Sequence, residues 1–399
     1  MRLSRRLGGA PRHDPAVETL RTIGLNALFL VPGETGGMET YARRLVPALA
    51  VAAPELEFVA FVGSKALERL GPEPFGPGVR SVVVGSTANR LRRVAVEQVA
   101  LPRLARREGI DLLHSLGTTA PALSGRVSVV TIHDVMYATH PEAHTTTMRS
   151  GMRLLVPLAA RSADRIITPS EAAKRDVVAR LGVSADRVDA IHSAGGLPPG
   201  PVTPEDELRR RYSLGEAPLV LSVSARRPHK NLVRLLDAFA RVDREPAPLL
   251  VLPGYRTAFE HEVADAIERL ELGDRVRTLG WIPDPDLEGL YGTAACFVFP
   301  SLAEGFGQPV LEAMERGVPV ASSSASSLPE VGGDAVLYFD PLDVAAMAAA
   351  VCRLLDDPAL AERLVEAGRA RAREFSWERT ARKTIDVYRR AFAEHAGRP

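Results

Sequence analysis

Two glutamates, Glu304 and Glu312, are the first residues in this sequence whose spacing suggests chemistry. A strand-like run over residues 295–299 is followed by a glycine-containing loop that holds Glu304, and then by a helix-like run in which Glu312 lies two turns from the start. Both carboxylates are therefore expected to face one pocket. Such a pair can act as general acid and base, and its ionised oxygens can also accept hydrogen bonds from neighbouring hydroxyl groups.

Four basic residues gather in the turn that follows the strand-like run 219–223 and precedes a helix-like run: Arg226, Arg227, His229 and Lys230. Cations at the start of a helix oppose the helix dipole unless an anion lies there too. The turn therefore predicts a phosphate site, with Lys230 as a compact point charge and the arginines as bidentate donors. Lys230 is also one of four lysines among the 50 basic residues. Solvated surface charge is the alternative.

A glycine pair, Gly36 and Gly37, follows the strand-like run 22–31 and precedes a helix-like run. Glycine lets the backbone approach a ligand closely, and the first amides of a helix attract an anion such as a diphosphate. A tight turn between strand and helix is the alternative. The loop lacks the spacing of a dinucleotide fingerprint, and no acidic residue follows at the matching distance, so a nicotinamide cofactor is disfavoured.

His133 comes directly after the strand-like run 127–132, at the carboxyl end of the expected strand. Side chains at that end of a parallel strand point into the ligand crevice, where a histidine can bond a sugar hydroxyl or a developing charge. A capping pair of His133 with Asp134 is the alternative.

Neither a metal site nor a disulfide is expected. Asp284 and Asp286 flank a proline in a pattern typical of a turn and a helix cap rather than of a metal-binding DxD loop. The two cysteines, Cys296 and Cys352, lie far apart in apolar segments, where a reduced and buried thiol is typical. We therefore expect no essential divalent metal.

Apolar runs of strand length alternate with helix-like runs, and because these runs are continuously apolar they predict parallel sheets covered on both faces. About six strands are expected in each half: residues 22–31, 57–62, 81–84, 111–114, 127–132 and 165–168, then 219–223, 249–252, 276–279, 296–299, 318–321 and 336–339. The predicted fold class is α/β, with two doubly wound Rossmann-like domains and ligand sites in the cleft between them. The predicted parts are a flexible basic tail (1–21), an N-terminal domain (22–195), a linker (196–215), a second domain (216–375) and a final helix (376–399) that packs back on the first domain.

Composition excludes several classes of protein. With 399 residues and 46% hydrophobic content the chain can bury sizeable cores, and its net charge of +1 lacks the field expected of a nucleic-acid-binding protein. No run reaches the roughly twenty apolar residues that span a bilayer, and the start lacks the apolar core of a signal peptide. We therefore expect a cytoplasmic protein.

One local stretch, residues 89–107, is strongly basic. It predicts contact with an anionic membrane surface or with a diphosphate-linked acceptor; a solvated helix face is the alternative. Its six arginines are Arg90, Arg92, Arg93, Arg103, Arg106 and Arg107.

Taken together, these motifs resemble those of the family 4 retaining glycosyltransferases, also called glycosyl transferases group 1. Their GT-B architecture consists of two Rossmann-like domains that face a central cleft. The resemblance covers residues 22–395. It rests on GGMETYA (36–42), IHD (132–134), TPSEAAKRDV (168–177), RPHKNL (227–232), LGWIPDPDL (279–287), EGFGQPVLE (304–312) and LPEVGGDAVLYFDP (328–341).

The resemblance implies a role for each candidate residue. Glu304 would hold hydroxyls of the donor sugar, Glu312 would accept both hydrogen bonds of the ribose diol, and Lys230 would neutralise the departing diphosphate. The glutamates would thus be hydrogen-bond acceptors rather than an acid and a base. The remaining contacts would come from backbone amides of Phe306, Gly307 and Gln308 at the sugar and phosphate, Trp281 and Ile282 at the nucleobase, Gly36 and Gly37 near the diphosphate, and His133 near the sugar.

One position departs from the family pattern. Many relatives have an arginine six residues before the lysine, where this chain has Ser224. Arg226, Arg227 and His229 are the candidates that could replace its charge.

The function implied is transfer of a hexosyl unit from a nucleoside diphosphate sugar to a hydroxyl of a glycan, lipid-linked or small-molecule acceptor, with retained configuration. Fixed charges and amides would stabilise the leaving diphosphate. The IHD segment followed by HPE resembles a mannosyl branch and favours GDP-mannose. The alternatives are a nucleotide-sugar or glycan-binding subunit of low activity, a sugar-nucleotide epimerase, and a phosphorylase, for which no Schiff-base lysine is evident.

Overall fold

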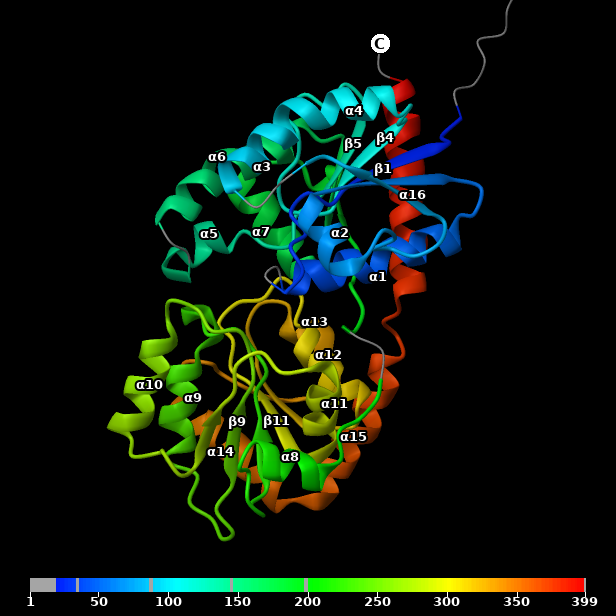
Figure 1. The fold of residues 1–399 in the computed structure, drawn as a ribbon. Helices are drawn as coiled ribbons and strands as arrows, with labels where there is room; N and C mark the ends of the chain where they lie inside the picture. Colours follow the sequence, from blue (N-terminus) through cyan, green and yellow to red (C-terminus); the bar gives the residue numbers. More distant parts are fainter. Residues whose placement is uncertain (1–18, 34–35, 86–88, 144–145, 197–199, 398–399) are drawn as a thin grey trace, which may run out of the picture.

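The computed structural model describes residues 19–33, 36–85, 89–143, 146–196 and 200–397, which form two α/β domains, one above the other in Figure 1. The chain builds the first domain, crosses to the second, and returns to the first with its last long helix, which is red in Figure 1. Most of the predicted N-terminal tail lies outside the described residues.

The sheet of the first domain is parallel and doubly wound. In the described residues its strand order is β3-β2-β1-β4-β5-β6-β7. All neighbouring strands are parallel, but the order in which the chain adds them reverses between β1 and β4, which we call the reversal point. The strands are β1 (Thr22–Asn26), β2 (Glu57–Val62), β3 (Val79–Val83), β4 (Leu112–Ser115), β5 (Val127–Thr131), β6 (Arg165–Thr168) and β7 (Val188–Ala190).

Helices connect these strands and cover the sheet, as parallel connections require. Helix α3, η1 and α4 follow one another without a break, so the basic stretch forms one long helical segment. The bounds are α1 (Gly37–Ala52), α2 (Ser64–Leu70), α3 (Arg90–Ala95), η1 (Val96–Ala100), α4 (Leu101–Arg107), α5 (Met136–Thr139), η2 (Pro141–Ala143), α6 (Thr146–Ser162), α7 (Glu171–Leu181) and η3 (Ala185–Arg187).

The second sheet repeats the same topology. Its strand order in the described residues is β10-β9-β8-β11-β12-β13, and its reversal point lies between β8 and β11. The strands are β8 (Leu219–Leu221), β9 (Leu249–Leu252), β10 (Val276–Thr278), β11 (Ala294–Phe299), β12 (Val320–Ser323) and β13 (Leu337–Phe339).

The helices of the second domain run from α8 to α15, and α16 then leaves it. The bounds are α8 (Glu205–Arg211), η4 (Pro228–Lys230), α9 (Leu232–Phe239), α10 (Glu260–Arg269), α11 (Asp284–Thr293), α12 (Gln308–Glu315), α13 (Leu328–Gly332), η5 (Gly333–Ala335), α14 (Val344–Asp356), α15 (Pro358–Ala372) and α16 (Trp377–Ala396).

Each strand expected from an apolar run is present, and the differences at its ends have local causes. Strand β1 stops at Asn26 because the chain turns there, with the Leu30 amide donating to the Ala27 carbonyl at 3.0 Å. Strand β12 begins after Pro319, which has no amide hydrogen to give to the ladder. Strand β7 was not predicted, because its three residues include an aspartate and form no apolar run.

Helix α16 packs on the first domain, against α1, β5 and β6. The Ser376 hydroxyl caps it by accepting the Arg379 amide at 3.2 Å. Further along, the Tyr388 hydroxyl lies 2.6 Å from Nδ1 of the buried His114, whose Nε2 lies 2.8 Å from the Thr131 hydroxyl. Burial lowers the pKa of His114 to about 3, so a neutral imidazole joins the last helix to the sheet.

The linker is shorter than the predicted 196–215. Helix α8, which lies within that range, packs against α11 of the second domain. The buried Asp286 carboxylate of α11 accepts hydrogen bonds from Arg211 Nη1 and from the Thr203 hydroxyl, each at 2.6 Å. The second domain therefore begins near Thr203, because this carboxylate fixes the segment to it.

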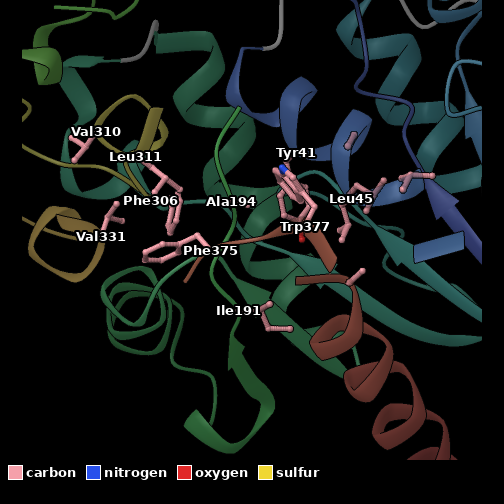
Figure 2. Packing of buried hydrophobic residues seen from close by; sticks show 14 of the residues in the cluster. Tyr41, Leu45, Ile191, Ala194, Phe306, Val310, Leu311, Val331, Phe375 and Trp377 are labelled. Carbon is pink, nitrogen blue, oxygen red and sulfur yellow. The ribbon is translucent and has the colours of Figure 1, made fainter. Parts of the chain in front are cut away.

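A single cluster of buried apolar side chains extends through both domains (Figure 2). Tyr41 of α1 lies edge-on to Trp377, with ring centroids 5.8 Å apart, and Phe306 of the second domain lies 5.8 Å from Phe375. Phe375 and Trp377 lie where the chain returns from α15 to α16. The two cores are therefore joined at this crossing.

Candidate active site between the domains

The candidate residues follow the carboxyl ends of strands in both sheets, and Lys230 and Glu304 follow the two strands at the reversal point of the second sheet. The turn after β8 holds Lys230, and the loop after β11 holds Glu304. Across the boundary, Gly37 is the first residue of α1, which follows β1 in the chain, and the end of β5 leads to His133. Doubly wound sheets bind ligands at such carboxyl ends.

Lys230 and Glu304 form an ion pair. Lys230 Nζ lies 2.6 Å from Glu304 Oε1, and the side chains are 16% and 10% exposed. The ammonium also lies 5.3 Å from the centroid of the Phe299 ring. Partial burial strengthens such a pair because less water screens it. The structure thus brings together the two residues that the sequence placed on a basic turn and on the glycine loop.

Asn231, next to Lys230, shapes this turn. It adopts a left-handed conformation with φ of 60°, which asparagine tolerates better than most residues. Its side-chain amide donates to the carbonyls of Pro300 at 3.0 Å and Pro341 at 2.7 Å, which fixes the turn to the loop after β11. Sequence reasoning missed Asn231, although an asparagine between a turn and a helix is a recognisable signal for this conformation.

The loop after Glu304 contacts the first domain directly. The Ser170 hydroxyl, at the start of α7, donates to the Gly305 carbonyl at 2.7 Å. A Cβ on Gly305 would lie 2.2 Å from the His133 carbonyl oxygen, so a glycine is required at this contact. Sequence reasoning did not single out Ser170, because its partner is 135 residues away.

His133 lies at this boundary as a neutral ring. Its Nε2 lies 2.9 Å from the Leu116 carbonyl, so that nitrogen carries the hydrogen and Nδ1 remains an acceptor. Burial lowers its pKa, and the hydrogen bond to Leu116 only partly opposes this. The Tyr41 ring packs edge-on against it with centroids 4.8 Å apart. Asp134 instead accepts the Met136 amide at 2.9 Å, as a cap would.

The glycine pair of the first domain meets α12 of the second. Gly36 is the N-cap of α1 with φ of 55°. A Cβ on Gly37 would lie 3.2 Å from Oε1 of Gln308, whose Nε2 lies 3.4 Å from the Ala194 carbonyl. Gly37 and Gln308 are therefore in close contact across the boundary between the domains.

Glu312 has different partners from those of the Lys230–Glu304 pair. It is the fifth residue of α12, about one turn from the start rather than two. Its Oε2 accepts the Tyr291 hydroxyl at 3.1 Å, and the Gly196 amide also donates to it. Burial raises the pKa of Glu312, and the nearby Arg316 partly offsets the shift. The structure thus places this carboxylate beside the first crossing between the domains.

Three further features concern metal binding, membrane-spanning helices and the cysteines. No group of three or more His, Cys, Asp or Glu side chains suited to a metal ion occurs within the described residues. Across the same part of the chain, no helix is long and apolar enough to cross a membrane. Both cysteines are free thiols; Cys296 is buried, as predicted, and burial raises its pKa to about 12, whereas Cys352 is only partly buried.

Comparison with known proteins shows the family of this chain. Residues 35–194 match the model of Glycosyltransferase Family 4, and residues 204–371 match that of Glycosyl transferases group 1. The O-antigen chain mannosyltransferase B of Escherichia coli is 35% identical over 266 residues, which cover 66% of this chain and 70% of that protein. The chain is a family 4 glycosyltransferase.

Other similar proteins agree with this. The MMP alpha-(1->4)-mannosyltransferase of Mycolicibacterium hassiacum is 33% identical over 246 residues, 59% of this chain and 56% of that protein. Sucrose-phosphate synthase from Thermosynechococcus elongatus matches with a TM-score of 0.74 at 24% identity, over 94% of this chain and 100% of that one. Anabaena HepE in complex with UDP and glucose matches with a TM-score of 0.73 at 21% identity, over 92% and 99%. The glycosyltransferase has the GT-B fold.

Arg226 has a structural role in this glycosyltransferase, which corrects the prediction that it binds the donor. The side chain is 1% exposed and forms an ion pair with Glu260 at 3.1 Å. Its guanidinium donates to the carbonyls of Gly254 at 2.8 Å, Leu252 at 3.1 Å and Leu279 at 2.7 Å. The donors that would bind a phosphate are therefore used to fix the loops after β9 and β10. Arg227, its neighbour, is exposed.

Replacing Arg226 should destabilise the glycosyltransferase strongly. Arg226→Met would remove the guanidinium bonds to the carbonyls of Gly254 and Leu279 and the ion pair with Glu260, while the Leu252 carbonyl would keep the Leu279 amide. This should lower the free energy of unfolding by about 3 kcal/mol. The exposed neighbour gives a matched control, since Arg227→Met should change it by less than about 0.5 kcal/mol. Urea denaturation of both variants measures the difference, and equal stabilities would contradict the buried role.

The two residues predicted to flank the nucleobase differ in their exposure. Trp281 is 61% exposed, whereas Ile282 is 7% exposed and belongs to the hydrophobic core. The side chain of Ile282 is thus withdrawn from the predicted contact with a base. Phe306 likewise points into the core, at 6% exposure, while Gly307 has a φ of 114° that favours glycine.

Proposed function

We propose that this glycosyltransferase moves a mannosyl unit from GDP-mannose to an acceptor hydroxyl with retention of configuration. The observation that carries the proposal is the Lys230–Glu304 pair, at 2.6 Å, on the reversal point of the second sheet. The relatives named as mannosyltransferases favour mannose as the sugar. The acceptor would be a glycan, a lipid-linked sugar or a small metabolite.

Lys230 would supply the positive charge on the leaving diphosphate. Its ammonium is partly buried, so charge that develops nearby would be screened less than in water. Glu304 would orient Lys230 and accept bonds from sugar hydroxyls. Because a fixed cation can do what a metal ion does in other transferases, we propose that the reaction needs no essential metal and no cofactor besides the nucleotide sugar.

Retention is proposed to occur by attack on the same side from which the diphosphate leaves. A double displacement needs a free carboxylate beneath the anomeric carbon. Glu304 is bound to Lys230, and Asp134 accepts the Met136 amide. Neither carboxylate is presented as a nucleophile, which favours the single-step route.

A donor screen tests the proposal. The purified protein is mixed with an alkyl mannoside as acceptor and with GDP-mannose, UDP-glucose, dTDP-glucose or ADP-glucose, with and without EDTA, and release of the nucleoside diphosphate is measured. GDP-mannose should be consumed equally in both conditions, and NMR of the product should show the donor's anomeric configuration. A preference for UDP-glucose would contradict the mannosyl assignment, and tight binding without turnover would favour a binding subunit.

We also propose peripheral contact with anionic lipid through the α3–α4 segment. Leu91 is 82% exposed and Val99 is 51% exposed, and the exposed Arg92, Arg103 and Arg107 lie on the same helical segment. Apolar side chains among arginines are typical of helices that rest on an anionic surface.

Vesicle co-sedimentation provides the measurement. Arg103→Glu should lower binding to phosphatidylglycerol vesicles about tenfold, since each basic residue near such a surface contributes about 1 kcal/mol. Arg363→Glu makes the same charge change at an exposed site on α15 and should bind like wild type. Equal binding to neutral phosphatidylcholine vesicles would argue against the contact.

A further inference from the structure

We propose that Glu330 is a positioning residue that holds the two domains in the arrangement in which the Glu304 loop meets His133. The inference rests on the proposed glycosyl transfer but concerns a residue outside the donor contacts. Glu330 lies on α13 of the second domain, and its carboxylate binds groups of the first domain.

The carboxylate of Glu330 binds the start of helix α7 with both oxygens. Oε1 accepts the Glu171 amide at 2.8 Å, and Oε2 accepts the Ala172 amide at 3.2 Å. Nε2 of His192, just after β7, lies 2.5 Å from Oε1. The first amides of a helix have no partner within the helix, and the helix dipole favours a negative charge there. The negative charge of Glu330 and the positive end of the α7 dipole therefore both strengthen this contact.

Glu330 is ionised at neutral pH in this position. Burial alone would raise its pKa, but the bonds from His192 and the two amides outweigh burial and hold the pKa below its usual range. The ionised carboxylate is the stronger acceptor at both oxygens, which suits its three donor partners.

Arg371 of α15 holds Glu330 from the side of the second domain. Its Nη2 donates to the Glu330 carbonyl at 2.7 Å, and its Nε donates to the Val331 carbonyl at 3.1 Å. The guanidinium also lies 4.9 Å from the Phe375 ring centroid. The backbone of Glu330 is thus fixed to the second domain while its side chain is fixed to the first.

The same end of α7 also contacts the loop that carries Glu304. Ser170 accepts the Ala173 amide at 3.0 Å and donates to the Gly305 carbonyl at 2.7 Å, where Gly305 approaches His133. The second domain is therefore attached to one helix end twice, through the neutral Ser170 bond and through the ionised Glu330. Charge-assisted bonds are the stronger kind, so Glu330 contributes more than Ser170 to holding this helix end against the second domain.

Substitution of Glu330 should lower turnover without weakening nucleotide binding. In the full-length protein, Glu330→Ala should lower kcat about 10- to 100-fold, the loss expected for bonds to a charged group. Glu330→Gln keeps the shape but not the charge and should lie between wild type and alanine. The Kd for GDP should stay within about twofold of wild type, because the nucleotide would bind to second-domain residues.

A neighbouring glutamate supplies the matched control. Glu171 lies at the same helix start with an exposed side chain, and the bond to Glu330 uses only its backbone amide. Glu171→Gln should therefore keep wild-type kcat. A merely structural effect of Glu330→Ala would damage the second domain itself and appear as a weaker Kd for GDP, which would count against the positioning role.

Small-angle X-ray scattering separates this inference from the proposed function, because it needs no substrate. Glu330→Ala should increase the radius of gyration, whereas Glu171→Gln should not. If wild type consumed none of the donors, the transferase assignment would fail while the scattering still tested the contact. Wild-type kcat in both Glu330 variants, or scattering curves identical to wild type, would overturn the proposal.

Discussion

Replacing Lys230 with alanine is expected to lower kcat about 100- to 1000-fold. The loss of one preorganised charge that stabilises the transition state has an effect of this size. Lys230 is held by Glu304 at 2.6 Å in a partly buried site, so the charge is already in place before the donor enters. The measurement is the steady-state release of GDP from GDP-mannose.

Three further proteins make the Lys230 result specific. Lys230→Arg keeps the charge but changes its shape and should retain part of the activity. Lys383→Ala removes another of the four lysines from an exposed position on α16 and should behave as wild type. Lys230→Met keeps an unbranched side chain of similar length but removes the charge, so inactivity equal to that of Lys230→Ala would show that the charge itself is needed. Wild-type kcat in Lys230→Ala would remove the basis of the proposed mechanism.

The second large effect is expected at Glu312. Glu312→Gln should raise KM for GDP-mannose about 10- to 100-fold with a smaller change in kcat, because two charge-assisted bonds to the ribose would be weakened in ground and transition states alike. Isothermal titration with GDP measures the same loss without turnover. An unchanged Kd would place the ribose elsewhere.

The pH dependence of donor binding should report on the same carboxyl group. Burial raises the pKa of Glu312, so in the free enzyme its carboxylate becomes protonated at a pH above the ordinary glutamate range. Only the ionised form can accept both hydroxyls, so kcat/KM should fall as the pH decreases through this raised pKa. In Glu312→Gln this acid limb should disappear.

A neighbouring carboxyl group gives the control for that profile. Burial raises the pKa of Glu315 to about 7, and this residue is not among the proposed donor contacts. Glu315→Gln should therefore keep the acid limb that Glu312 causes. Persistence of the limb in Glu312→Gln would assign it to another group.

The sequence could predict the fold because strands and helices leave local patterns. Continuously apolar runs gave the expected parallel strands, and glycine, proline and asparagine signals marked the loops that follow them. Strand β7 was not predicted because its residues, Val188–Ala190, have no such pattern. It forms only through pairing with β6.

The site was less predictable, because its contacts join distant segments. A cluster of basic residues after a strand does not reveal which side chain turns inward, and Arg226 does so while Arg227 stays exposed. Ile282 and Trp281 differ in the same way: Ile282 is buried and Trp281 is exposed, since neighbours on a chain point to different sides. Ser170 and Glu330 have partners in the opposite domain, 135 and 159 residues away, and no local signal records such a pairing.

The two crossings between the domains limit how the molecule can move. The first crossing follows β7, and the second joins α15 to α16. They are tied together, because Trp377 Nε1 donates to the Gly195 carbonyl at 2.9 Å and the Thr380 hydroxyl donates to the His192 carbonyl at 2.7 Å. Because the two connections are bound to each other, they act as one attachment between the domains. We therefore expect any change in the angle between the domains to pivot about this attachment.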